Sequence, residues 1–72
     1  MRDEVRVTLN GKSTDIEKTD ALVDVLRRLG VGIDATGVAV AVNEAVVPRS
    51  EWGSRRLATG DVVEVIRAAQ GG

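Results

Sequence analysis

The feature that most limits the fold is one short segment with helical spacing, set among segments with strand spacing. Four of its apolar residues recur at i, i+3, i+4 and i+7 and so share one helical face: Leu22, Val25, Leu26 and Leu29. Thr19 or Asp20 can cap the start, and Gly30 is typical of the residue after a helix end. We therefore predict a helix at Asp20–Leu29 whose apolar stripe packs on a flat apolar surface.

The rest of the chain supplies that surface as strands. Val is the commonest apolar residue, and β-branched residues favour strands. Alternation with period two predicts a strand at 5–9, and Asn10-Gly11 predicts a tight turn into a polar edge strand at 12–17. Further strands are expected at 38–42, 45–47 and 62–67.

The last of these segments indicates how the sheet is ordered. Val62–Arg67 has apolar residues on both faces, as expected of a central strand. We predict an α+β fold: a mixed sheet of four to five strands, the first and last side by side, with one helix packed on one face. Trp52, the only aromatic residue, is expected to cover an edge of the core.

The face of the sheet without the helix is predicted to carry an apolar patch made of Ala39, Ala41, Val62 and Ile66. Patches of this kind usually mark contact with a partner, although single exposed aliphatic residues are also common. Arg49, Arg67 and Glu64 are candidates for steering a partner by charge, although most exposed charges contribute little. We expect partner binding at Val62, Ile66, Ala39, Ala41 and Arg67.

Composition excludes several classes of function. The 72 residues make one domain, and without Cys or His the chain has no disulfide, thiolate nucleophile, Cys/His zinc site or imidazole base. A net charge of −1 and a single aromatic residue argue against nucleic-acid binding. No apolar run suits a membrane span and no signal-peptide pattern is present. We expect a cytoplasmic, monomeric protein that is not an enzyme and binds no metal.

The tail is the remaining distinctive stretch, with the sequence Ala68-Ala69-Gln70-Gly71-Gly72. Glycine lacks a Cβ, so a Gly-Gly end is thin and tolerates unusual backbone angles, although a frayed end or an expression scar would look the same. Fully extended, residues 68–72 reach about 17 Å. We predict a globular domain at 1–67 and a flexible tail at 68–72 that inserts the Gly72 carboxylate into a narrow slot on another protein.

Several stretches, taken together, point to one family. They are the Asn-Gly hairpin, the short Leu-rich helix, the block Val38–Trp52 with its Val-Pro-Arg segment, and the ending LATGDVVEVIRAAQGG. Over nearly its whole length the chain resembles the ThiS family of sulfur carriers, which has the ubiquitin-like β-grasp fold. Ala-Ala-Gln stands before Gly-Gly where that family often has a small residue or glycine.

The resemblance implies a carrier and not a catalyst. The carboxylate of Gly72 would be adenylated and converted to a thiocarboxylate, with Gly71 and Gln70 completing the tail. The implied partners are a ThiF-type adenylating enzyme that uses ATP, a persulfide sulfur donor, and thiazole synthase, which takes the sulfur into the thiazole ring of thiamine. The carrier itself would bind no cofactor.

Three other functions share these features. A sulfur carrier of the molybdopterin synthase small-subunit type has the same fold and Gly-Gly end, although the Val-Pro-Arg segment and the lack of Phe favour ThiS. A ubiquitin-type protein modifier would form conjugates with lysines. An interaction module would keep its binding after loss of Gly71 and Gly72.

Overall fold

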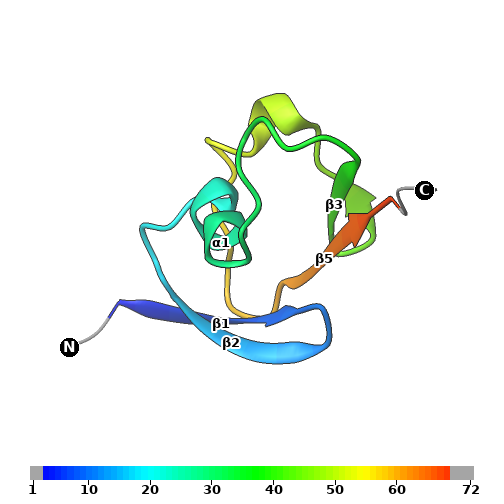
Figure 1. Cartoon of the computed structure of the whole chain (residues 1–72). Helices are drawn as coiled ribbons and strands as arrows, with labels where there is room; N and C mark the ends of the chain where they lie inside the picture. Colours follow the sequence, from blue (N-terminus) through cyan, green and yellow to red (C-terminus); the bar gives the residue numbers. More distant parts are fainter. Residues whose placement is uncertain (1–2, 69–72) are drawn as a thin grey trace.

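A computed structural model describes residues 3–68 and shows one sheet with one α-helix packed across it (Figure 1). Its elements are β1 (Glu4–Leu9), β2 (Lys12–Glu17), α1 (Leu22–Arg28), β3 (Val38–Val42), β4 (Ala45–Val46), a 3-10 turn (Arg49–Glu51) and β5 (Val62–Arg67). The sheet order is β2-β1-β5-β3-β4, with β1 and β5 parallel and the other pairs antiparallel. The predicted mixed sheet, its single helix and its central pair of first and last strands are confirmed.

Two hairpin turns in the sheet share one backbone conformation. Asn10 and Gly11 join β1 to β2 with φ of 49° and 84°, the positive values that the predicted tight turn requires. Asn43 and Glu44 join β3 to β4 with φ of 52° and 71°. The second turn therefore holds a glutamate where the first holds a glycine, and a non-glycine residue in this region costs about 1–2 kcal/mol.

Replacing Glu44 with glycine is expected to stabilise the protein by about 1 kcal/mol, because glycine adopts positive φ without the steric cost. For a domain of this size that corresponds to a rise of about 4–8 °C in melting temperature. The matched control is Glu44→Ala, which removes the carboxylate but keeps the Cβ and should leave the melting temperature nearly unchanged. Thermal unfolding followed by circular dichroism measures both melting temperatures. An equal rise in melting temperature for the two variants would contradict backbone strain as the cause.

The start of α1 differs from the prediction. The helix begins at Leu22 with Ala21 as its N-cap, so neither Thr19 nor Asp20 caps it. Asp20 instead accepts a hydrogen bond from the Glu17 N–H at 3.0 Å and forms an ion pair with Arg28 at 2.7 Å. Its carboxylate therefore ties the end of β2 to the last turn of the helix.

Two of the free N–H groups at the start of α1 are satisfied by a distant loop. The N–H of Leu22 donates to the carbonyl of Arg55 at 2.8 Å, and the N–H of Val23 donates to the carbonyl of Trp52 at 2.9 Å. Orphan N–H groups at a helix start need such acceptors. The loop after the 3-10 turn therefore fixes where α1 begins.

The end of α1 is as predicted. Gly30 follows the last helical turn with φ of 81°, and its N–H donates to the carbonyl of Arg27 at 3.0 Å. The N–H of Val31 donates to the carbonyl of Leu26 at 3.0 Å, and both of these side chains are buried. This is the Schellman arrangement, which stops the helix and turns the chain back over the core.

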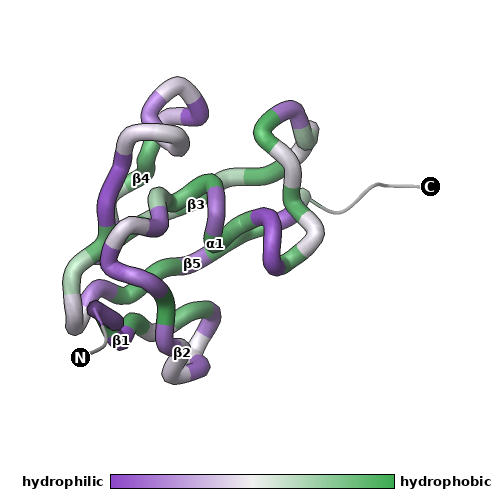
Figure 2. The backbone as a smooth tube through the Cα atoms, turned by 90° about the vertical axis from the view of Figure 1, so that its left-hand side faces the viewer, coloured by the Kyte–Doolittle hydropathy of each residue, from purple (hydrophilic) through white to green (hydrophobic). Residues whose placement is uncertain are grey.

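The core lies between α1 and the inner face of the sheet, and Trp52 is one of its fully buried side chains. Its side chain is 1% exposed, and its indole N–H donates to the carbonyl of Val47 at 3.0 Å. The guanidinium of Arg49 lies 4.7 Å from the centre of the ring and also donates to the carbonyl of Ile33. The hydropathy colouring in Figure 2 shows apolar residues along β3 and β5, the two strands that run through the middle of the fold. None of the helices formed by residues 3–68 has the length and apolar character needed to cross a bilayer.

Candidate partner-binding site and the start of the tail

The face of the sheet opposite α1, called the outer face below, carries most of the exposed large apolar side chains. Strand register sets Ala39 opposite Ile66, and it sets Ala41 opposite both Val46 and Glu64. Ile66 is 58% exposed and Val62 is 43% exposed, while Val63 on the inner face is fully buried. The two faces of β5 predicted from the sequence are therefore as expected.

Two details of the outer face were not predicted. Val46 in β4 is 73% exposed and lies on this face with Val62 and Ile66. The sequence predicts only that it belongs to a short strand. Ala41, in contrast, is only 8% exposed and offers little surface to a partner. Its methyl group is short, and its register neighbours Val46 and Glu64 carry larger side chains that rise above it.

The edge of the outer face nearest the β3–β4 turn is held by a polar network around Asn43. The Asn43 amide donates to the Asp61 carboxylate at 2.9 Å and accepts from the Val62 N–H at 2.9 Å. The Asn43 N–H donates in turn to the Val62 carbonyl at 2.8 Å. These bonds fix the turn against the first residue of β5. A shallow hollow lined by Asn43, Glu44, Val62 and Glu64 lies beside it.

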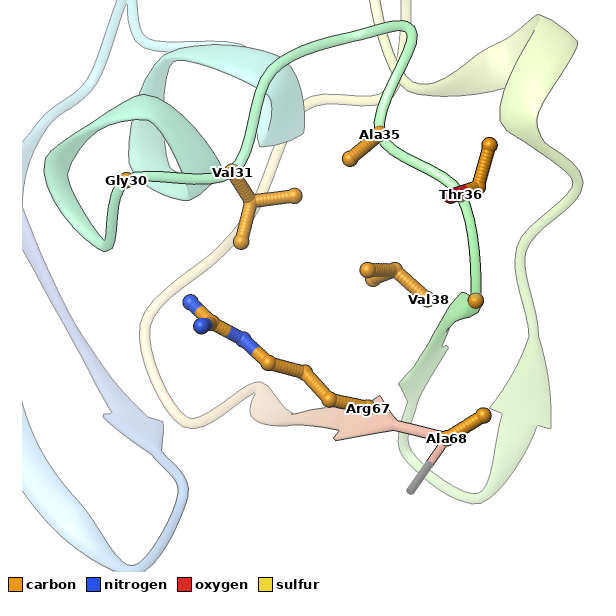
Figure 3. Close-up of a pocket in the computed structure, with 8 residues that line it drawn as sticks. Gly30, Val31, Ala35, Thr36, Val38, Arg67 and Ala68 are labelled. Atoms are coloured by element: carbon orange, nitrogen blue, oxygen red, sulfur yellow. The ribbon is translucent and has the colours of Figure 1, made fainter. Parts of the chain in front are cut away.

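Arg67 does not belong to the outer face, contrary to its predicted grouping with Val62 and Ile66. Alternation along β5 turns its side chain toward the helix side, where the guanidinium donates to the carbonyl of Leu29 at 2.9 Å (Figure 3). Cations are favoured at a helix C-terminus because the last carbonyls lack partners there. Arg67 thus fastens the end of β5 to the end of α1. The guanidinium of Arg49, the other candidate cation, lies over the ring of Trp52.

The point where the tail leaves the sheet is held on both sides. The N–H of Ala68 donates to the carbonyl of Gly37 at 2.6 Å, which extends the pairing of β5 with β3 by one residue. The side chain of Arg67 holds the preceding residue to the helix. A hollow of about 230 Å³ lies between this point and the loop that follows α1 (Figure 3). The predicted tail residues Gln70, Gly71 and Gly72 lie outside the described residues.

The titratable groups with shifted pKa values lie elsewhere on the sheet. Arg6 in β1 donates from Nε to Asp15 Oδ1 in β2 at 2.8 Å. This hydrogen bond, and with it the charge of Arg6, lowers the pKa of the Asp15 carboxyl. Within residues 3–68, acidic side chains form no group of three or more suited to a metal ion.

Substituting Arg6 with glutamine is expected to raise the pKa of Asp15 toward the ordinary aspartate value of about 3.9. Because the folded pKa is depressed, the pair stabilises the fold above that value, and its contribution is lost as the pH falls through the folded pKa. The substitution should therefore lower the stability of the fold near neutral pH and leave it unchanged in strong acid. A carboxyl titration by NMR measures the shift, and an unchanged Asp15 pKa would contradict the pairing.

Comparison with known proteins agrees with this architecture. The model of the ThiS family matches residues 4–72. The sulfur carrier protein ThiS of Thermus thermophilus is 45% identical over 67 residues, which cover 92% of this chain and 98% of that protein. The crystal structure of the thiamine biosynthesis protein ThiS from Geobacter metallireducens matches with a TM-score of 0.72 at 27% identity, covering 94% of this chain and 100% of the other. The fold is thus the predicted β-grasp, and the chain belongs to the ThiS family.

Proposed function

We propose that this chain is a sulfur carrier of thiamine biosynthesis and that the carboxylate of Gly72 is the group that is loaded. The observation that carries the proposal is that the family match extends to residue 72. The Gly-Gly end therefore lies within the part of the chain that the family model matches. The fold supports the same role, because Arg67 and Ala68 anchor the chain just before the tail begins.

The chemistry of the loaded group explains why activation is needed. A carboxylate is a poor electrophile because its negative charge is delocalised over the carbonyl. Attack of a Gly72 carboxylate oxygen on the α-phosphorus of ATP expels pyrophosphate and gives an acyl-adenylate. A persulfide sulfur then attacks the carbonyl carbon and expels AMP, and a thiol reductant cleaves the S–S bond to free the thiocarboxylate. Donors of the partner enzyme stabilise the developing charge.

We assign the three chemical steps to partners. A ThiF-type adenylating enzyme binds ATP, a persulfide donor supplies the sulfur, and thiazole synthase consumes it. The carrier binds no cofactor of its own. Gly71 and Gly72 leave the carbonyl unhindered, so that a nucleophile can approach it inside a channel.

The outer face is the docking surface in this proposal. Val46, Val62 and Ile66 are exposed apolar side chains that share it. Glu64 lies among them and, within residues 3–68, forms no ion pair, so it remains available to a cationic group of the partner. Ala39 adds a small contact opposite Ile66.

Replacing Ile66 with glutamate is expected to raise the Kd for the adenylating enzyme at least about tenfold, which corresponds to about 1.4 kcal/mol. The cause is a charge buried without a partner at the interface. The chain offers a matched control in Ile33→Glu, because Ile33 is 44% exposed but lies in the loop after α1. Isothermal titration calorimetry of the folded variants measures the Kd. An unchanged affinity for the Ile66 variant would exclude the outer face as the docking surface.

The function itself is tested by intact mass spectrometry. The chain is incubated with ATP, the adenylating enzyme, a persulfide donor and a thiol reductant, and the expected product is heavier by about 16 Da, the difference between sulfur and oxygen. Fragmentation should locate the added mass at Gly72. Failure to consume the terminal carboxylate would overturn the proposal. Higher-mass conjugates on a blot from the native cell would point instead to a protein modifier.

A further inference from the structure

β5 is paired along its whole length on one side but only along its first half on the other. On the β3 side, register pairs run from Val42↔Val63 to Val38↔Arg67. On the β1 side, the pairs are Thr8↔Val62 and Leu9↔Val63, after which β1 turns away at Asn10. The second half of β5 is therefore an edge strand, although the strand lies in the middle of the sheet.

The hydrogen bonds show where the pairing with β1 stops. The N–H of Asn10 donates to the carbonyl of Val63 at 2.9 Å, and the Asn10 side-chain oxygen then accepts from the N–H of Val65 at 2.8 Å. The side chain thus stands in for one more residue of β1. Backbone groups alternate in direction along a strand, so the carbonyl of Val65 and the N–H of Arg67 point to the same side beyond Asn10. In the part of the chain that the structure describes, no strand lies along these two groups.

We propose that this pair of groups, called the open edge below, receives an extended backbone segment of the adenylating enzyme, which adds as a strand beside β5. The inference rests on the proposed function. The open edge offers one donor and one acceptor, which is the pattern that an added strand satisfies. It also runs directly into the tail, since Ala68 follows at once and Gly72 is at most about 14 Å farther on.

Strand addition fixes the position of the carrier along the partner, which an apolar face alone does not. Contacts of Val62 and Ile66 tolerate small slides, whereas backbone pairing fixes position along the strand, and a slip to the next equivalent register moves the chain by about 7 Å. The Gly72 carboxylate must meet the α-phosphorus of ATP within bonding reach, and errors of about 1 Å already cost rate. The side chain of Arg67 does not obstruct the open edge, because it is turned to Leu29 on the helix side.

The test uses the full 72-residue chain made by chemical synthesis. In one variant the amide between Ile66 and Arg67 is replaced by an ester, which removes the Arg67 N–H from the open edge. In the matched control the amide between Val63 and Glu64 is replaced, which removes an N–H that faces Ala41 in β3 and leaves both groups of the open edge intact. Each chain is titrated with the adenylating enzyme and ATP, and its melting temperature is measured.

We expect the Arg67 ester to raise the Kd about three- to tenfold, the effect of losing one intermolecular hydrogen bond, and to lower the melting temperature less than the control does, because it only weakens the Ile66 carbonyl that faces Ala39. The Glu64 ester should lower the melting temperature but leave the Kd of the folded chain within about twofold. Equal affinities of the Arg67 ester and the all-amide chain would overturn strand addition while the carrier function stands. An all-amide chain that is never adenylated would overturn both.

Amide hydrogen exchange gives a second measurement that needs no variant. The Arg67 N–H should exchange fast in the free chain and at least about tenfold more slowly in the complex, whereas the Val65 N–H, held by Asn10, should be protected in both. Unchanged exchange at Arg67 would overturn the proposal. So would a dimer of the free chain that the Arg67 ester converts to a monomer, because the open edge would then belong to a second copy.

Discussion

Truncating Trp52 to alanine is expected to lower the free energy of unfolding by about 3–5 kcal/mol, a large part of the total. The side chain is 1% exposed, and its removal leaves a cavity in the core. A domain of this length has a total stability of roughly 4–11 kcal/mol. The loss also reaches the helix, because the chain around Trp52 supplies the carbonyls that accept from the first N–H groups of α1. Urea unfolding followed by circular dichroism measures the change.

A phenylalanine at position 52 separates the two contributions of the indole. Trp52→Phe keeps most of the buried volume but removes the N–H that donates to Val47. It should cost about 1–3 kcal/mol, the penalty for a buried carbonyl left without its donor. An unfolding midpoint for the alanine variant equal to that of the parent would contradict a stabilising role of the buried Trp52 side chain.

Deleting Gly71 and Gly72 is expected to abolish adenylation without changing the melting temperature. The shortened chain ends about 7 Å from where the reacting carboxylate should be, and misplacements far smaller than this cost about 100-fold in rate. The fold should be unaffected, because the last described contact of the chain is that of Ala68 with Gly37. Pyrophosphate exchange with the adenylating enzyme measures the rate.

A length-preserving variant shows whether the tail must also be thin. Gly71→Ala keeps the reach of the chain and adds one methyl group beside the reacting residue, so activity should fall but remain measurable. If the deleted chain were adenylated at the parent rate, the Gly-Gly end would be incidental and the chain would be an interaction module.

The strands and turns could be predicted because their signals are local. Period-two alternation marked β1 and β3, and Asn10-Gly11 marked the first hairpin with its positive φ values. Gly30 marked the end of α1 in the same way. Each of these depends on residues within a few positions of one another, so the rest of the fold does not override them.

The errors arose where distant residues decide the outcome. Asp20 is a good capping residue, but carbonyls from the loop at Trp52 and Arg55 already satisfy the start of α1. The full burial of Trp52 depends on that same loop and could not be predicted from a local pattern. Arg67 is different, since counting by two from Val63 would have assigned it to the helix side from the sequence alone.

The central place of β5 has a consequence for how the chain is made. β1 and β3 are not neighbours, and β5 pairs with both, so the last of the described strands joins the β2-β1 half of the sheet to the β3-β4 half. A nascent chain still lacking residues 62–67 leaves the apolar sides of both halves open to water. Fragments of this protein that end before β5 should therefore stay unfolded and sensitive to protease, and folding should begin only when residues 62–67 can pair with β1 and β3. The strand that completes the sheet is also the strand that leads into the tail, so the tail never follows an incomplete sheet.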